Sequence, residues 1–242
     1  MWRRGCVKNK GPARWLTVCR PPQAAATRAL NAGSTLDKVL ALVKEVAPTL
    51  KAPLVLFTYY NPILRRGTEK FMQQVAESGA AGLLIPDIPL EETAVARGIA
   101  TRYGIQLVLL ATPTTKEARM RQIAEATSGF VYLVSVTGVT GVQESMQLRV
   151  KSLIASLKSV TDKPVAVGFG VQRADQAAQL AEWGADGVIV GSALVRALGE
   201  APTPEQGLQR LQQLAASLRG ALPPGGVASS FWDKLVAGKL FS

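Results

Sequence analysis

Residues 164–195 read PVAVGFGVQRADQAAQLAEWGADGVIVGSALV and hold one full copy of the pattern that runs through this chain. Two apolar runs, Pro164–Gly170 and Gly187–Gly191, are continuously hydrophobic, as expected of parallel strands buried on both faces. An amphipathic stretch that ends at Gly184 separates them. The segment therefore predicts a strand, a helix and a second parallel strand.

The same alternation extends upstream to Pro53. Four further apolar runs are separated by helical spacers of about 10–20 residues, in the range of βαβ units: Pro53–Tyr60, Gly82–Pro86, Gln106–Ala111 and Phe130–Ser135. Further helices are expected at 36–48 and 204–220. Six strands with alternating helices fit either an eight-fold barrel or an open doubly wound sheet.

The glycine pattern favours the barrel. Residues 167–173 read VGFGVQR, which has a GxG but lacks the third glycine of a dinucleotide-binding loop, and no GxxxxGK[ST] motif is present. The predicted fold is an α/β protein of the (β/α)8 TIM-barrel type, incomplete, with about six of its eight strands.

Helix boundaries have recognisable chemistry. Ser34 and Thr114 each stand three residues before an acid, the spacing of a capping box, and Thr203-Pro204 offers an N-cap with proline in the first turn. Gly79, Gly104 and Gly184 are expected to end helices in a left-handed conformation.

Charge and composition exclude several classes of function. The net charge is +11, but residues 1–36 hold seven bases and no acid, whereas the other 206 residues hold 21 bases and 17 acids. The excess is therefore terminal, and nucleic-acid binding is not favoured. The chain has no histidine, which excludes Ser-His-Asp and imidazole-metal chemistry, and only two cysteines, Cys6 and Cys19. No metal site is expected. The longest charge-free run, Ala126–Gln143, is too polar to span a membrane.

Three parts of the chain can be distinguished. Residues 21–220 form the predicted barrel domain. Residues 1–20 show neither strand nor helix periodicity and are expected to be an aberrant or transit-like segment. Residues 221–242 begin with the breaker cluster LPPGG and are expected to be a C-terminal tail.

The predicted site lies where the strands end, because barrels carry function at the carboxyl ends of their strands. Glycines at the ends of the last two strands, with a helix starting at Ser192, would let backbone N–H groups approach a phosphate. The alternative is that these glycines only relieve crowding between strand and helix. The loop Val136–Ser145 is either a lid or a plain connection.

Acidic and aromatic residues at the same edge also have two interpretations. Asp87 is a functional acid or, as we favour, an N-cap of the helix that follows it. Glu91 and Glu92 are best explained as first-turn acids of that helix. Tyr132 lies inside a strand and fits a core or a site equally well.

Several segments together resemble the tryptophan synthase alpha subunit, and their sequences are most similar in kind to those of plant, algal and cyanobacterial members. They are LVLFTYYNPIL (54–64), GLLIPDIPLEET (82–93), FVYLVSVTGVTG (130–141), PVAVGFGVQ (164–172) and GADGVIVGSALV (184–195), and PPQAAATRALNAGSTLDKVL (21–40) resembles an early helix of the family. The resemblance implies a lyase of tryptophan biosynthesis that cleaves indole-3-glycerol phosphate to indole and glyceraldehyde 3-phosphate. It implies no cofactor for this chain, and a pyridoxal-phosphate-dependent beta subunit as its partner.

The resemblance also assigns residues. The substrate phosphate would be bound by Gly141, Gly168, Phe169, Gly170, Val171, Gly191 and Ser192. The indole pocket would be lined by Phe57, Tyr59, Leu84 and Tyr132. Thr140 and Gly141 would belong to the lid, and Asn61 and Asp87 to the interface with the beta subunit.

The first part of the family pattern is missing or replaced. The family carries a catalytic Glu on its second strand and an Asp in the next loop, and these positions fall near Val7 and Val18, so no catalytic residue is assigned. Retro-aldol cleavage needs such acid–base groups. We therefore expect a catalytically impaired lyase, or alternatively a non-catalytic partner or modulator of the beta subunit. Another sugar-phosphate barrel enzyme, such as an epimerase, is a weaker third reading. The basic residues at the start of the chain and the resemblance to plant sequences favour a location in the chloroplast, with the cytoplasm as the alternative.

Overall fold

The computed structural model describes residues 25–50, 52–134, 144–168 and 170–223. The expected segments 1–20 and most of 221–242 lie outside these residues, so their assignment stays a prediction.

All strand pairs in this part of the chain are parallel. The strands are β1 (Val55–Phe57), β2 (Gly82–Leu84), β3 (Gln106–Val108), β4 (Leu110–Ala111), β5 (Val131–Val134), β6 (Val165–Gly168) and β7 (Gly187–Ile189). They form two ladders, β1-β2-β3 and β4-β5-β6-β7. Because β3 and β4 are one stretch of chain interrupted at Leu109, the seven labels correspond to the six predicted strands.

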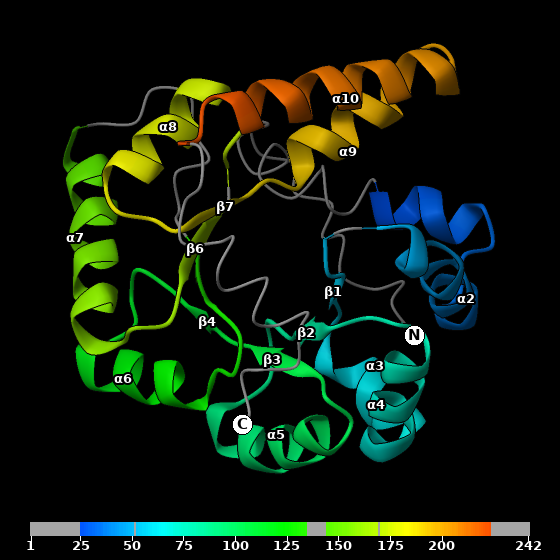
Figure 1. Cartoon of the computed structure of the whole chain (residues 1–242), viewed down its shortest axis with the longest axis horizontal. Coiled ribbons are helices and arrows are strands. Elements are labelled where there is room, and N and C mark those ends of the chain that lie inside the picture. The colour runs from blue at the N-terminus through cyan, green and yellow to red at the C-terminus, as the bar shows by residue number, and fades with distance from the viewer. Residues whose placement is uncertain (1–24, 51, 135–143, 169, 224–242) are drawn as a thin grey trace, which may run out of the picture.

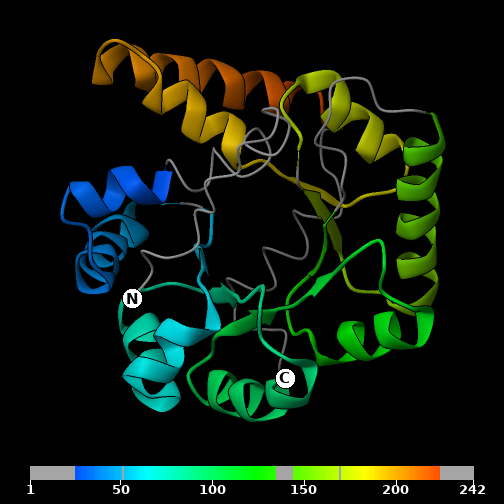
Figure 2. The ribbon, with the colours of Figure 1, turned by 180° about the vertical axis from the view of Figure 1, so that it is seen from behind.

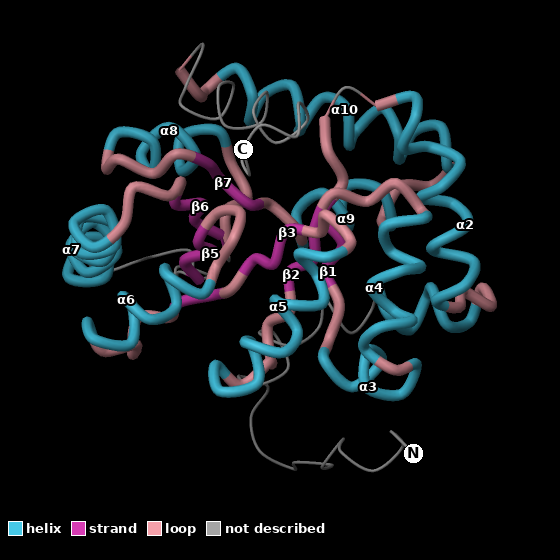
Figure 3. The backbone as a smooth tube through the Cα atoms, turned by 60° about the horizontal axis from the view of Figure 1, so that its bottom comes forward, coloured by secondary structure: helices cyan, strands magenta, loops and turns pink. Residues whose placement is uncertain are grey.

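Helices surround the strands in a ring, as Figures 1 and 2 show from opposite sides. They are α2 (Leu36–Val46), η1 (Ala47–Thr49), α3 (Tyr60–Arg66), α4 (Thr68–Glu77), η2 (Leu90–Glu92), α5 (Thr93–Arg102), α6 (Glu117–Ala126), α7 (Glu144–Val160), α8 (Ala174–Glu182), α9 (Ser192–Gly199) and α10 (Pro204–Gly220), after a helical stretch at 25–31. The strands stand inside this ring and follow the order of the chain around it (Figure 3). The expected TIM-type fold is confirmed, and the strands of the described ranges make up an incomplete barrel.

Side-chain alternation along the strands makes two apolar layers. Leu83, Leu107 and Leu133 are fully buried in the large core that also contains helix residues such as Phe71 and Ile154. A residue adjacent to each of these leucines points the other way, into a smaller cluster formed by Leu84, Val108 and Tyr132. Since only the first cluster contains helix side chains, the smaller one is the inner face of the barrel.

The structure confirms some of the predicted helix ends and contradicts others. Gly79, Gly104 and Gly184 all have positive φ, as predicted, and Thr203 caps α10 by accepting a hydrogen bond from the N–H of Gln206 at 3.3 Å. The other two caps were wrongly placed. Thr35, and not Ser34, accepts from the N–H of Lys38. Helix α6 begins at Glu117 after Lys116, so Thr114 is not its cap.

The first apolar run, residues 53–60, is longer than the strand it contains. The ladder ends at Phe57, and Tyr60 already opens α3. A carboxylate from a neighbouring loop, described below, satisfies the N–H of Tyr60 and thereby favours an early helix start.

Candidate functional site

Two of the four predicted indole-pocket residues lie in the inner cluster, and the other two lie at the end of β1 and just after it. Leu84 and Tyr132 are 5% and 8% exposed and belong to the inner cluster. Phe57 is in register with Leu84 across β1 and β2. Its ring meets the ring of Tyr59 edge-on, with centroids 6.4 Å apart, and both are about 60% exposed. The four residues thus form an apolar floor and an open aromatic rim.

Gly168 and Tyr132 fit together at the end of β6. A Cβ on Gly168 would lie 2.8 Å from Cε2 of Tyr132 and 2.8 Å from Cβ of Ile189. Glycine is therefore required here by close packing of the phenol, whatever else its backbone does. Burial raises the pKa of Tyr132 above its ordinary value, so its hydroxyl stays neutral at physiological pH.

The tips of the last two strands carry the other glycines of the predicted phosphate site. Gly170 has a φ of 88°, a conformation that favours glycine, and Val171 beside it is buried. Gly191 is the N-cap of α9, which begins at Ser192 as the sequence indicated. A Cβ on Gly191 would meet no atom within 4 Å, so crowding among the described residues does not explain this glycine.

Asp87 does not cap the helix that follows it. The residue before η2 is Pro89, and no side chain caps that helix. Instead, Oδ1 of Asp87 accepts a hydrogen bond from the backbone N–H of Tyr60 at 2.8 Å. Asp87 therefore caps α3, which follows the neighbouring strand, and the favoured sequence interpretation was right about capping but wrong about the helix.

The other two acids at this edge are also engaged. Glu91 forms an ion pair with Arg119 at 2.8 Å, which lowers the pKa of Glu91. Burial, with a hydrogen bond and the charge of Glu92, raises the pKa of Tyr60. Both acids lie in the first turn of η2, as expected. Of the carboxylates that closely follow strand ends in the described ranges, Asp87, Glu91 and Glu92 all hold structural partners.

Three threonines after β4 form a hydrogen-bonded cluster that the sequence did not predict. Oγ1 of Thr112 lies 2.9 Å from Oγ1 of Thr114 and 3.1 Å from Oγ1 of Thr115, and the N–H of Thr112 donates to the same Thr115 oxygen. Arg149 from α7 donates to the carbonyl of Pro113. The sequence TPTT shows that three hydroxyl groups lie close together along the chain. Their hydrogen bonds to one another could not be predicted, because they depend on the turn that these residues form in the structure.

Several predicted residues lie outside the described ranges. They are Val7, Val18, Thr140, Gly141 and Phe169, together with most of the predicted lid loop. Within the ranges that are described, no group of histidine, cysteine or acidic residues could hold a metal ion. No helix found there is both long and apolar enough to cross a bilayer.

The parallel strands and the helices around them define a (β/α)-barrel protein of the TIM type. The family model "Tryptophan synthase alpha chain" matches residues 22–222. This chain belongs to the tryptophan synthase alpha chain family, whose members are lyases that cleave indole-3-glycerol phosphate. The family needs no cofactor of its own, because pyridoxal phosphate belongs to the beta subunit.

The relatives include plant and cyanobacterial proteins. The alpha chain of Arabidopsis thaliana is 54% identical over 200 residues, which cover 83% of this chain and 73% of the relative. That of Cyanothece sp. is 53% identical over 202 residues, covering 84% and 75%. A structure of the tryptophan synthase α2β2 complex from Pyrococcus furiosus matches with a TM-score of 0.77 and 38% identity, over 83% of this chain and 80% of that one.

Proposed function

We propose that this chain binds indole-3-glycerol phosphate at the open end of its barrel and cleaves it far more slowly than a lyase with a full acid–base pair. The observation that carries the binding proposal is the start of α9. Gly191 opens this helix with free space beside it. A helix N-terminus offers unpaired N–H groups and a partial positive charge, which together favour a phosphate.

The second strand tip supports the same placement. Gly168 is in register with Ile189, so the segments that follow β6 and β7 leave the sheet side by side. Gly170, Val171, Gly191 and Ser192 then present backbone from two neighbouring loops. We propose that Phe169 and Gly141 complete this phosphate site, and that Thr140 and Gly141 belong to a lid over it.

The inner face supports the position of the indole ring. Leu84 and Tyr132 are buried side chains of the inner cluster, and Phe57 is the exposed neighbour of Leu84. An apolar bicyclic ring would cover this aromatic and aliphatic surface and remove it from water. Tyr59, in contact with Phe57, would form the outer side of the pocket.

The proposal of slow cleavage rests on the positions of the acidic residues in this chain. The first acid of the chain is Asp37, and the positions that correspond to the family's Glu and Asp fall near Val7 and Val18. The carboxylates that closely follow strand ends in the described part are occupied by Tyr60 and Arg119, as shown above. Each missing acid–base group is expected to cost about 10²–10⁴-fold in rate.

Two substitutions at Gly191 test the phosphate site. Gly191→Asp adds a negative charge at the start of α9, whereas Gly191→Asn adds a side chain of the same shape without charge. Both residues are good N-caps and find open space, so the fold should tolerate both. We expect G191D to weaken binding of glycerol 3-phosphate at least tenfold by calorimetry, while G191N stays within about threefold of the parent. Equal affinities of the two variants would show that the phosphate does not bind there.

We also propose that the chain assembles with a tryptophan synthase beta subunit through the rim that carries Asn61 and Asp87. Both residues are exposed, and Asp87 binds the backbone next to Asn61, so the two form one surface. The alternative function, a non-catalytic modulator of the beta subunit, uses the same surface. Beta-subunit activation by a preparation without any cleavage activity would favour that alternative.

The similarity to plant and cyanobacterial relatives supports a proposed location in the chloroplast. The acid-free, arginine-rich residues 1–36 are consistent with import into a plastid. A fluorescent fusion of the whole chain in plant cells tests this, and diffuse cytoplasmic signal would contradict it.

A further inference from the structure

The aromatic rim of the proposed indole pocket is held between a strand and a short helix. The N–H of Thr58 donates to the carbonyl of Leu84 at 3.1 Å, which extends the ladder of β1 and β2 by one bond. Tyr60 is already the first residue of α3, and Tyr59 lies between the two. Because Tyr59 is 62% exposed, few side chains surround its ring, and its position follows that of the backbone on either side. The position of α3 therefore helps to set the position of Tyr59.

Helix α3 is too short to hold its place by itself. It has seven residues. A helix of this size is about 10 Å long and is not stable alone in water. Ile63 is its one buried residue. After Arg66 the chain turns at Gly67, whose φ is 84°, and α4 follows at Thr68. Contacts at the two ends of α3 are therefore needed to fix it, and Asp87 supplies one at its start.

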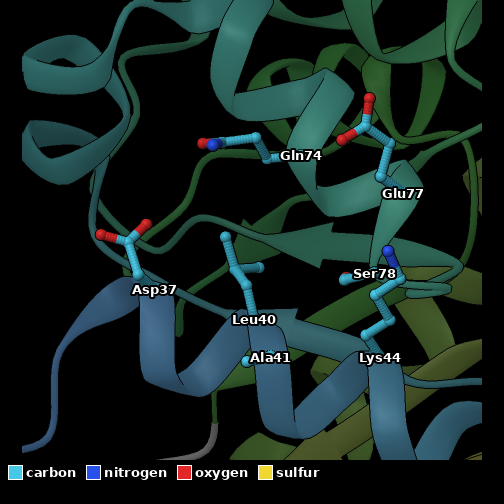
Figure 4. A pocket seen from close by; sticks show the side chains of 7 residues that line it. All are labelled: Asp37, Leu40, Ala41, Lys44, Gln74, Glu77 and Ser78. Carbon is cyan, nitrogen blue, oxygen red and sulfur yellow. The ribbon is translucent and has the colours of Figure 1, made fainter.

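Arg66 fixes the far end of α3 to two other helices. Its two terminal nitrogens donate to the two carboxylate oxygens of Asp37 in α2, with Nη2 3.1 Å from Oδ2. Nη1 also donates to Oε1 of Gln74 in α4 at 3.0 Å. Figure 4 looks into the groove between these helices, where Asp37 and Leu40 come from α2 and Gln74 from α4. A two-point contact between a guanidinium and a carboxylate fixes orientation as well as distance.

Helix α2 is a firm support for this contact. Leu40 and Val43, on the inner side of α2, are buried in the main core. The Arg66 side chain is only 24% exposed, although that of Asp37 is 69% exposed. The hydrogen bond from Arg66 lowers the pKa of Asp37, so the carboxylate stays charged at physiological pH. The end of α3 is thus tied to a part of the outer wall that is itself anchored.

We propose that Arg66 is a positioning residue for the indole pocket: from the outer wall it holds α3, and through α3 it keeps Tyr59 beside Phe57. The inference rests on the proposed function, because it assumes that the aromatic rim meets the indole ring. Backbone hydrogen bonds make two turns of helix a nearly rigid unit, so α3 transmits the position of its end to its start. The proposed phosphate-binding residues follow β6 and β7, in the other ladder, and are outside this series of contacts.

Two arginines at the end of α3 provide a matched test. Arg66→Met removes the guanidinium, and Arg65→Met makes the same change at an exposed residue that has no hydrogen bond or ion pair with the described part of the chain. We expect R66M to weaken binding of indole-3-glycerol phosphate about fivefold by calorimetry, and to leave the affinity for glycerol 3-phosphate within about twofold of the parent. R65M should leave both affinities unchanged. An equal loss for both ligands in R66M, or no loss for either, overturns the proposal. If the parent binds neither ligand, the proposed function itself fails.

A double substitution separates positioning from a general loss of stability. If Arg66 acts through Tyr59, the change at Arg66 should have little further effect once Tyr59 is alanine. We expect Arg66→Met/Tyr59→Ala to bind indole-3-glycerol phosphate within about twofold of Tyr59→Ala alone. A full further loss in the double variant would contradict the proposed route.

Asp37→Ala breaks the same contact from α2 and leaves α3 unchanged, so it serves if R66M folds poorly. It should weaken binding of indole-3-glycerol phosphate and spare glycerol 3-phosphate, as R66M does. Parental affinity for both ligands in D37A would overturn the proposal.

Discussion

At the scale of single residues, the site combines positions that the sequence could indicate with partners that it could not. The glycines after the last two strands were visible as a pattern, and the structure gives each a different reason. Gly168 makes room for Tyr132, Gly170 adopts a positive φ, and Gly191 borders open space. Asp87 shows the limit, because its partner Tyr60 is 27 residues away and the contact depends on two neighbouring strand ends.

The packing of Gly168 predicts a large cost for one added methyl group. Gly168→Ala would place its Cβ against Ile189 and Tyr132, and overpacking of this kind costs about 1–3 kcal/mol. Gly187→Ala on the neighbouring strand is the control, since its Cβ would make only an ordinary 3.5 Å contact with Ala166. Urea unfolding should show a clear loss of stability for G168A and a smaller change for G187A. Equal losses would contradict the packing account.

Tyr132 predicts a dependence of stability on alkaline pH. Burial raises the pKa of its phenol in the folded state, so the unfolded chain loses this proton first as the pH rises. The stability contributed by the neutral phenol is complete below the ordinary tyrosine pKa of about 10 and declines above it. Melting temperatures between pH about 9 and about 11 should fall more steeply for the parent than for Tyr132→Phe. Parallel curves would show that Tyr132 ionises as easily when folded.

At the scale of elements, periodicity located the helices and strands and local chemistry placed their ends less well. All six apolar runs contain strands, and the glycine stops were correct. Start positions failed where two candidate caps stood side by side. Thr35 follows Ser34, and only backbone geometry decides which hydroxyl faces the free N–H groups. Thr114 failed for a different reason, because no side chain caps α6 and the hydroxyl of Thr114 pairs with that of Thr112.

The cap of α2 gives a matched pair of substitutions. Thr35→Ala removes the side chain that accepts from Lys38, and loss of an N-cap costs about 1 kcal/mol. Ser34→Ala removes the neighbouring hydroxyl, which the sequence had favoured, and should change stability by less than about 0.5 kcal/mol. Chemical unfolding of both variants decides between them. A larger loss of stability in S34A than in T35A would show that Ser34, and not Thr35, caps α2.

At the scale of the whole molecule, the sequence predicted an incomplete barrel, and the described strands form one. The count of six runs followed from hydrophobic pattern alone, because buried parallel strands are uninterrupted apolar segments. Which strands pair with which could not be inferred from those runs, since pairing depends on how the folded chain arranges them. Family membership follows from the match over residues 22–222, whereas the proposed slow cleavage rests on positions near Val7 and Val18, which lie outside that match.

The most direct test of the account compares binding with cleavage in one preparation. The full chain is mixed with a tryptophan synthase beta subunit, the affinity for indole-3-glycerol phosphate is measured by calorimetry, and cleavage is followed in a single turnover by rapid quench. We predict saturable binding that G191D weakens at least tenfold, with cleavage at least about 10²-fold slower than in the Arabidopsis relative treated identically. Cleavage within tenfold of that relative would contradict the proposed lack of acid–base groups, and absence of binding would contradict the phosphate site.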